Sequence, residues 1–152
     1  MAKKNKVTLD FSGFEEVAEK IDKFGGDLKD IFNKALTECG KKITKDVIEA
    51  VKPQNLPAKG KFSYGWTKQS IIRSPVVKWR GPCAEMSVGF DKRKQGAGGY
   101  LISGTPRRKG NAGMKPAPML NRIFKGKRYM SQRKKEMKAI FEKEAQKLLK
   151  KL

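Results

Sequence analysis

The chain has 152 residues, of which 38% are hydrophobic, and carries a formal net charge of +21. This length suits one domain, and the hydrophobic share is too high for a disordered polymer but small enough to predict a modest core. No apolar stretch approaches the roughly 18 residues of a membrane-spanning helix, so the sequence predicts no membrane segment.

The positive charge is distributed unevenly along the chain. Residues 1–49 contain ten acidic and ten basic side chains, whereas residues 50–152 contain twenty-six basic and five acidic ones. Between Asp91 and Glu136 there is no carboxylate side chain. Such a surplus in one segment predicts a surface for a negatively charged partner, which is nucleic acid, anionic lipid or an acidic protein face.

The N-terminal segment predicts a short strand and a first helix. Apolar and polar residues alternate over 7–11, which is typical of a strand. Ser12 and Glu15 have the spacing of a capping box, in which each side chain satisfies an orphan backbone donor. Gly25 and Gly26 then end the helix.

A second, longer helix is expected from Asp27, its N-cap, to about Lys52. Apolar residues keep one stripe at helical spacing for five turns in this segment. Pro53 disfavours the helical conformation in the residue before it, so the helix ends there.

The central segment predicts a loop followed by an antiparallel hairpin. Residues 53–66 are rich in proline, glycine and lysine. Residues 71–80 are a strand candidate in which Pro75 indicates an edge position or a bulge. Gly81-Pro82 is a turn, and residues 84–90 alternate as a half-buried strand does.

The C-terminal segment predicts basic, glycine-rich connections followed by a helix. A short apolar segment lies at 100–102, and residues 104–115 are predicted to be mobile. Residues 119–124 form a compact apolar patch. Ser131 is the expected cap of a final amphipathic helix over 131–152, whose other faces carry mostly lysine, arginine and glutamine.

Together these elements predict a single α+β domain over 1–152. Strand and helices occupy 7–52, the hairpin and loop region 53–130, and the C-terminal helix 131–152. Elements segregated in this way favour an antiparallel β-sheet packed against a long N-terminal helix and a C-terminal amphipathic helix, with long basic loops.

Residues with catalytic potential are sparse. The chain contains no histidine, the commonest general base and metal ligand. Cys39 and Cys83 lie far apart in the sequence and favour buried free thiols over a zinc site or a disulfide. Asp91 is the only carboxylate near the loop region. We therefore expect no catalytic site, no metal site and no cofactor.

Two further features have alternative interpretations. Phe62, Tyr64 and Trp66 stand among lysines, and such aromatics either stack on nucleic-acid bases or anchor a loop to the core or a neighbouring subunit. Residues 96–99 could approach a phosphate with their backbone amides, but they lack the strand-to-helix context of a phosphate loop. Anchoring and a flexible connection are the favoured interpretations.

Five short motifs follow one another in an order that has a known counterpart. They are Phe11-Ser12-Gly13-Phe14, Val51-Lys52-Pro53, the Gly-Trp-Thr-Lys-Gln-Ser-Ile run from Gly65 to Ile71, Tyr100 to Thr105 with its final Gly-Thr, and Pro116-Ala117-Pro118-Met119-Leu120. In this order the chain resembles the tail-completion, or head–tail joining, proteins of long-tailed bacteriophages and prophages. It departs from their pattern at Ser103, where glutamate is common, in a longer loop over 53–65, and in an extra basic stretch over 125–128.

The resemblance implies a non-enzymatic structural protein of the virion. Such a protein forms a homo-oligomeric ring, typically of six subunits, that completes the tail and joins the tail tube or terminator proteins to the head connector. It would reside in the tail or neck region of the virion, and in the host cytoplasm during assembly.

The resemblance also implies which residues make contacts. Those assigned to the neighbouring subunit or partner, from the loop and the apolar patch, are Tyr100, Gly104, Thr105, Arg107, Arg108, Lys109, Pro116, Pro118, Met119, Leu120 and Phe124. Candidate contacts with an acidic partner or, in passing, with genomic DNA are Lys92, Arg93, Lys94, Lys125, Lys127 and Arg128. The alternative function is that of a stand-alone basic nucleic-acid-binding protein, which rests on charge alone.

Overall fold

The computed structural model describes residues 6–9, 28–57, 65–80, 83–94, 96–107, 109–110 and 112–151, with only the backbone described for 6–9 and Cys83. Several predicted features lie outside these residues: the end of the first strand, the helix after Ser12, the Asp27 cap, Phe62, Tyr64 and the Gly81-Pro82 turn. The elements in chain order are β1 (Lys6–Leu9), α2 (Leu28–Ala50), the 3-10 helix η1 (Pro53–Asn55), α3 (Thr67–Gln69), β2 (Val77–Arg80), β3 (Cys83–Ser87), α4 (Gly98–Ser103), α5 (Pro118–Lys125) and α6 (Lys127–Lys150).

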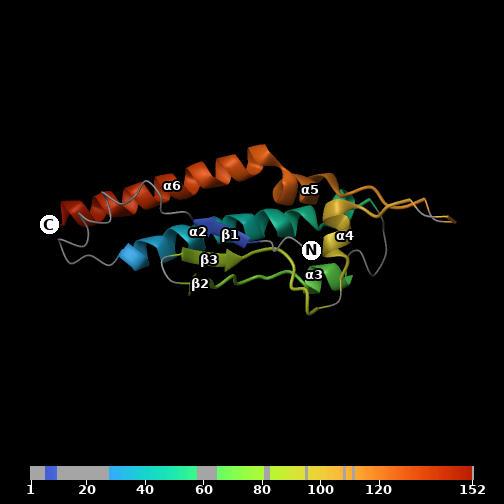
Figure 1. Ribbon diagram of the computed structural model, residues 1–152, viewed down its shortest axis with the longest axis horizontal. Helices are drawn as coiled ribbons and strands as arrows, with labels where there is room; N and C mark the ends of the chain where they lie inside the picture. The colour runs from blue at the N-terminus through green and yellow to red at the C-terminus, as the bar shows by residue number, and fades with distance from the viewer. Residues whose placement is uncertain are drawn as a thin grey trace.

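Helix α2 lies between the β-sheet and helix α6 (Figure 1). The predicted long helix that stops by Lys52 is confirmed: α2 ends at Ala50, and the chain turns into η1 at Pro53. Its apolar residues repeat at helical spacing, so they are buried along the length of the helix. They are Ile31, Phe32, Ala35, Leu36, Cys39, Ile43, Val47 and Ala50.

The three described strands form an antiparallel sheet in the order β1-β3-β2. The predicted hairpin is confirmed, because β2 pairs with β3 from Val77 opposite Met86 to Arg80 opposite Cys83. Ala84 and Met86 point inward and are buried, whereas the alternate residues of β2 are exposed. This alternation follows from the two-residue period of a strand and leaves one face of the hairpin outside the core.

Helix α2 approaches the sheet closely at Gly40. A Cβ atom added there would lie 2.1 Å from Cε of Met86. The absence of a side chain at this buried helix position is what gives Met86 room to fill the space between helix and sheet.

The strand predicted over 71–80 is shorter than expected. Only Val77–Arg80 are in β2, while Ile71 forms an isolated antiparallel bridge with Phe90. Between these two pairings, residues 72–76 face residues 87–89, so the first segment contains extra residues and bulges. Pro75 lies in this bulge, as a residue without a backbone N–H must when it interrupts a strand.

The last helix begins earlier than predicted, and this corrects the expected cap at Ser131. Residues 118–125 form the separate helix α5, and α6 starts at Lys127 after the single residue Gly126. The amide of Gly126 donates to the Arg122 carbonyl and its own carbonyl accepts from Met130. A Cβ at Gly126 would lie 2.3 Å from the Arg122 oxygen, so the sharp junction requires glycine.

Helix α6 packs along α2 through apolar residues and a set of polar contacts. Met137, Phe141 and Ala145 are buried against the core. Lys34 Nζ donates to Glu144 Oε2 at 2.8 Å, and the Tyr129 hydroxyl donates to Asp46 of α2. Among the described residues, no helix is both long and apolar enough to cross a bilayer.

Phe32 of α2 contacts both of the layers that pack against this helix, the β-sheet and helix α6. Its ring stacks on Phe141 of α6 at 4.5 Å between centroids and meets Trp79 of β2 edge-on at 6.4 Å. The Trp79 indole also donates from Nε1 to Asn33 Oδ1 of α2 at 2.9 Å. The α+β fold expected from the sequence is confirmed, with the aromatic contacts of Phe32 at its centre.

Replacing Phe32 with alanine is expected to destabilise the domain by about 3–5 kcal/mol, because it removes both aromatic contacts and leaves a cavity between helix and sheet. Ile48→Ala, on the exposed face of the same helix, is the matched control and is expected to cost under about 1 kcal/mol. Urea denaturation measures both free energies of unfolding. Equal costs for the two variants would contradict a central role for Phe32.

The ion pair between Lys34 and Glu144 joins α2 to α6. Hydrogen bonds from Lys147 and Lys34 lower the pKa of Glu144 to about 2. A carboxylate whose pKa is depressed in the folded state stabilises that state above its unfolded pKa, and the effect is lost as the pH falls towards the folded pKa.

Glu144→Gln should therefore lower Tm at pH 7, and the difference from the unsubstituted protein should vanish as the pH falls towards about 2. Glu142→Gln is the control, since Glu142 is more exposed and lies 3.9 Å from Lys138. Thermal melts across this pH range make the comparison. A Tm difference that does not change with pH would show that the carboxylate charge is not what stabilises the contact.

Candidate assembly surface

An arm formed by residues 105–114 extends from the end of the molecule where α4 and α5 meet (Figure 1). It leaves the body after α4, which ends at Ser103, and returns to it before Pro118, where α5 begins. Arg108 and Asn111 are outside the described residues. The arm corresponds to the segment for which the sequence predicts a mobile loop.

The base of the arm is closed by an antiparallel bridge between Thr105 and Met114. The Thr105 amide donates to the Met114 carbonyl at 2.8 Å, and the Met114 amide donates to the Thr105 carbonyl at 3.3 Å and to its Oγ1 at 2.8 Å. Gly104 and Gly113 flank the bridge with φ of +74° and +75°, a conformation that L side chains rarely adopt. The base is therefore specified by backbone bonds and two glycines.

The base is also fixed to the body of the protein. The Ala117 amide donates to the Leu101 carbonyl at 2.7 Å, and the Asn121 side chain donates from Nδ2 to the Ile102 carbonyl at 2.9 Å. Leu101 and Ile102 are themselves buried in the core. These contacts give the arm a defined direction relative to α4 and α5.

Beyond the bridge, most of the described residues of the arm are exposed. Pro106, Arg107, Lys109, Gly110 and Ala112 are all in the exposed class. Arg107 and Lys109 place positive charge near the tip. The described part of the arm beyond its bridge thus presents a cationic, solvent-accessible projection.

Five of the residues assigned to contacts by the resemblance lie in α4, in α5 or in the segment that leads into α5, and they differ in exposure. Tyr100 is 64% exposed, and Pro116 and Pro118 are exposed as well. Met119 and Phe124 are half-buried, and the Phe124 ring contacts Phe90 at 6.2 Å between centroids.

The prediction that Leu120 contacts a neighbouring subunit or partner is wrong. Its side chain is fully buried in the core of the chain, so it is not accessible to a partner. The segment that reads as an apolar surface patch is helix α5, and helical periodicity turns Leu120 and Ile123 inward together.

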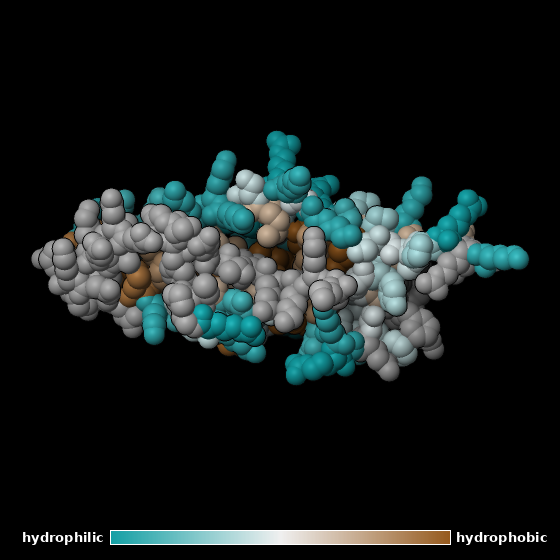
Figure 2. Space-filling model, viewed as in Figure 1, coloured by the Kyte–Doolittle hydropathy of each residue, from teal (hydrophilic) through white to brown (hydrophobic). Residues whose placement is uncertain are grey.

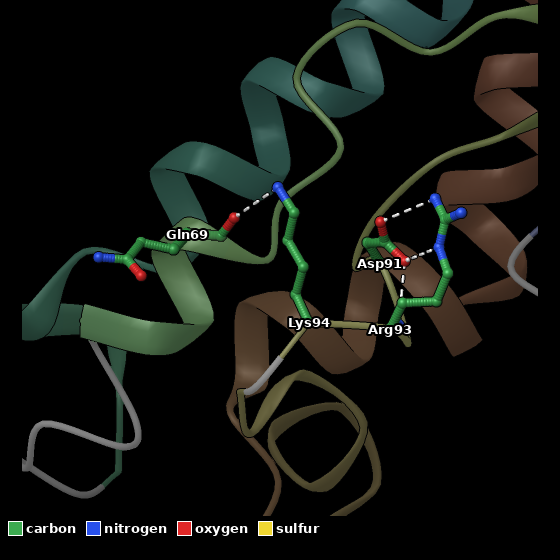
Figure 3. A network of polar contacts seen from close by, with 4 residues as sticks. All are labelled: Gln69, Asp91, Arg93 and Lys94. Atoms are coloured by element: carbon green, nitrogen blue, oxygen red, sulfur yellow. Dashed lines mark hydrogen bonds and ion pairs between the residues drawn. The ribbon is translucent and has the colours of Figure 1, made fainter.

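The basic loop after β3 is partly neutralised by internal contacts (Figure 3). Asp91 accepts from Arg93 at both carboxylate oxygens, with Nε–Oδ1 of 3.1 Å and Nη2–Oδ2 of 3.2 Å. These bonds, with one from the Arg93 amide, lower the pKa of Asp91. Lys94 donates from Nζ to the Gln69 carbonyl at 3.5 Å. Of the three predicted contacts, Lys92 alone makes no side-chain hydrogen bond or ion pair within the described part of the chain, and it is exposed.

The pairing of Asp91 with Arg93 was missed by sequence reasoning, which considered Asp91 only as a catalytic candidate. Only one residue separates them in the sequence, and this short spacing was the signal from which a local ion pair could have been predicted. Their contact closes a tight turn, in which the Arg93 amide also donates to the Asp91 carboxylate at 3.0 Å.

The remaining basic residues lie away from the arm. Lys125, Lys127 and Arg128 flank Gly126 at the junction of α5 and α6, and all three are exposed. Eight residues of helix separate the arm side of α5 from this junction, which corresponds to about 12 Å. The structure therefore does not bring this basic stretch to the arm base.

Other reactive side chains are few in the described part of the chain. No group of three or more His, Cys, Asp or Glu residues there could hold a metal ion. Cys39 is a free thiol buried on α2, and burial raises its pKa. The structural features that distinguish this end of the molecule are the arm and its exposed surroundings.

Comparisons with protein-family models, with curated proteins and with solved structures each found no match.

The glycines of the arm allow a test of its base. Gly113→Ala would place a Cβ 2.6 Å from the Thr105 carbonyl oxygen, in addition to its unfavourable positive φ. Gly110→Ala has a similar φ of +80° but no neighbouring atom within 4 Å. Gly113→Ala is therefore expected to reduce the hydrogen-exchange protection of the Thr105 and Met114 amides by about tenfold or more.

Gly110→Ala is the control and should change the protection of the same amides by under about threefold. Exchange measured residue by residue distinguishes the two variants. If both amides exchange at unprotected rates in the unsubstituted protein, the bridge is not a stable feature of the arm.

Proposed function

We propose that this chain is a non-enzymatic assembly protein that forms an oligomeric ring at the head–tail junction of a long-tailed bacteriophage, and that the arm over 105–114 docks on a neighbouring subunit or on the adjoining ring. The observation that carries this proposal is the exposed arm, fixed at its base by the Thr105–Met114 bridge and extending away from the body.

The geometry of the arm favours insertion into another molecule. Its exposed part gains little stability from its own subunit, while its base is already ordered by backbone hydrogen bonds. Ordering the base in advance lowers the entropy lost on association. Arg107 and Lys109 near the tip are complementary to an acidic surface on the neighbouring molecule. Such complementarity would speed the association of the two surfaces and fix their alignment.

The positions of the family-like motifs in the fold also support the proposal. Gly104-Thr105 forms the arm base, and Pro116 to Pro118 leads directly into α5 beside it. The Gly65–Ile71 run passes through α3 to the bridge with Phe90. α3 is tied to the segment before α4 by a bond from the Ala97 amide to Thr67 Oγ1, so these motifs converge on the end of the molecule that carries the arm.

The lysine-rich face of α6 favours a second candidate function, binding to DNA. Hydrophilic side chains project over this helix in Figure 2. A helix face with repeated cations can follow a phosphate backbone, with an affinity that falls steeply as salt rises. The exposed lysines of α6 are Lys127, Lys134, Lys135, Lys138, Lys143, Lys147 and Lys150.

Reversing the charges of the arm tests the assembly function. In nuclease-treated protein, the unsubstituted chain is expected to form closed rings, seen by electron microscopy and sedimentation. The R107E/K109E variant should keep its Tm within a few degrees but sediment mainly as a monomer, with self-association weakened about tenfold or more. The matched control K134E/K135E makes the same charge change on α6 and should still assemble.

Two outcomes would contradict the assembly function: an unsubstituted protein that stays monomeric after nuclease treatment, or an R107E/K109E variant that assembles normally. DNA binding has its own signature. If K134E/K135E alone weakens binding to a duplex, and affinity for that duplex falls by about 10³–10⁵ between roughly 50 and 200 mM salt, the second candidate is supported.

A further inference from the structure

A second surface lies on the outer face of the β2–β3 hairpin, away from α2. Strand β2 is at the edge of the described sheet, since its only pairing among the described strands is with β3. An edge strand presents alternate backbone N–H and C=O groups to whatever lies beside it. The outward residues of this segment are Val76, Lys78 and Arg80.

A groove of about 510 Å³ runs over this face. Val76 and Val88 contribute apolar walls, and four cationic side chains but one carboxylate line it. That carboxylate belongs to Asp91 and is occupied by Arg93. The groove is therefore positively charged around an apolar strip.

The cations of the β2 edge have charge available for a ligand. Within the described part of the chain, the exposed Lys78 side chain makes no ion pair or hydrogen bond. Arg80 has a long contact of 3.7 Å with Glu85, and its side chain is 69% exposed. Val76 is 68% exposed, which is high for a large apolar side chain next to a strand.

The spacing along β2 specifies the complementary sequence. Residues two apart on a strand lie on the same face, about 7 Å from one another, and an added strand has the same repeat. In an antiparallel strand laid beside β2, alternate residues would lie opposite Arg80, then Lys78, then Val76. We propose that this edge binds an extended peptide of a partner protein with the pattern acidic–x–acidic–x–aliphatic.

An acidic peptide fits these features better than the other occupants. A second copy of β2 would place lysine and arginine against lysine and arginine, which is unfavourable. A DNA phosphate backbone would engage the cations but neither the exposed Val76 nor the unpaired strand edge. The inference does not depend on the assembly function, because the groove and the arm are formed by different residues.

Binding of a labelled peptide, Thr-Glu-Thr-Glu-Thr-Val-Thr, tests the proposal by fluorescence anisotropy with the full-length protein. We expect saturable binding that K78E/R80E weakens about tenfold or more, because two attractive cross-strand pairs become repulsive. The control variant K134E/K135E should change the Kd by under about twofold. R107E/K109E should behave like this control.

Two altered peptides test the strand geometry on the unsubstituted protein, so they remain informative if K78E/R80E fails to fold. One has the same composition with adjacent glutamates, and the other carries N-methyl groups on alternate amides. Each should bind about tenfold more weakly. The proposal is overturned if either binds as well as the parent, if K134E/K135E weakens binding as much as K78E/R80E, or if a DNA duplex displaces the peptide and depends equally on Lys78 and Arg80.

Discussion

Helix α2 is packed on two sides at once, and the other elements are arranged by that constraint. One part of its apolar stripe meets Phe141 and neighbouring residues of α6, and another part meets the sheet at Met86 and Trp79. Phe32 contacts both layers through its ring. Because a single helix supplies both interfaces, the sheet and α6 are held in place relative to each other by α2.

The high net charge is compatible with this core because the cations remain outside it. Apart from Arg133, no lysine or arginine among the described residues is buried. Arg133 lies over the Tyr129 ring, 4.9 Å from its centroid, and pairs with Glu136. The few carboxylates of α6 are used in contacts to lysines, as Glu144 is with Lys34 and Lys147. Exposed cations are found on the outer face of α6, at the α5–α6 junction, on the arm and along the β2 edge.

The arm and the groove differ in what they offer a partner. The arm extends from one end of the molecule and has a base ordered by the Thr105–Met114 bridge, so it suits insertion into a neighbouring surface. The β2 edge, which pairs with no other described strand than β3, carries Lys78, Arg80 and Val76 beside the groove, so it suits an extended segment that adds to the sheet. A protein with both could contact two different partners, one by each surface.

The sequence by itself determined the course of α2, the residues of the hairpin that face the core, and the α+β class. These features follow from a hydrophobic period of 3.6 residues in a helix or 2 in a strand, which depends only on neighbouring residues. It could not place the start of α6, since Gly126 acts through a close approach to the Arg122 carbonyl. Nor could it show that Leu120 points into the core, that Asp91 is held by Arg93, or that residues 105–114 form a bridged arm. Only the tertiary structure decided these features, because each depends on which segments meet in space.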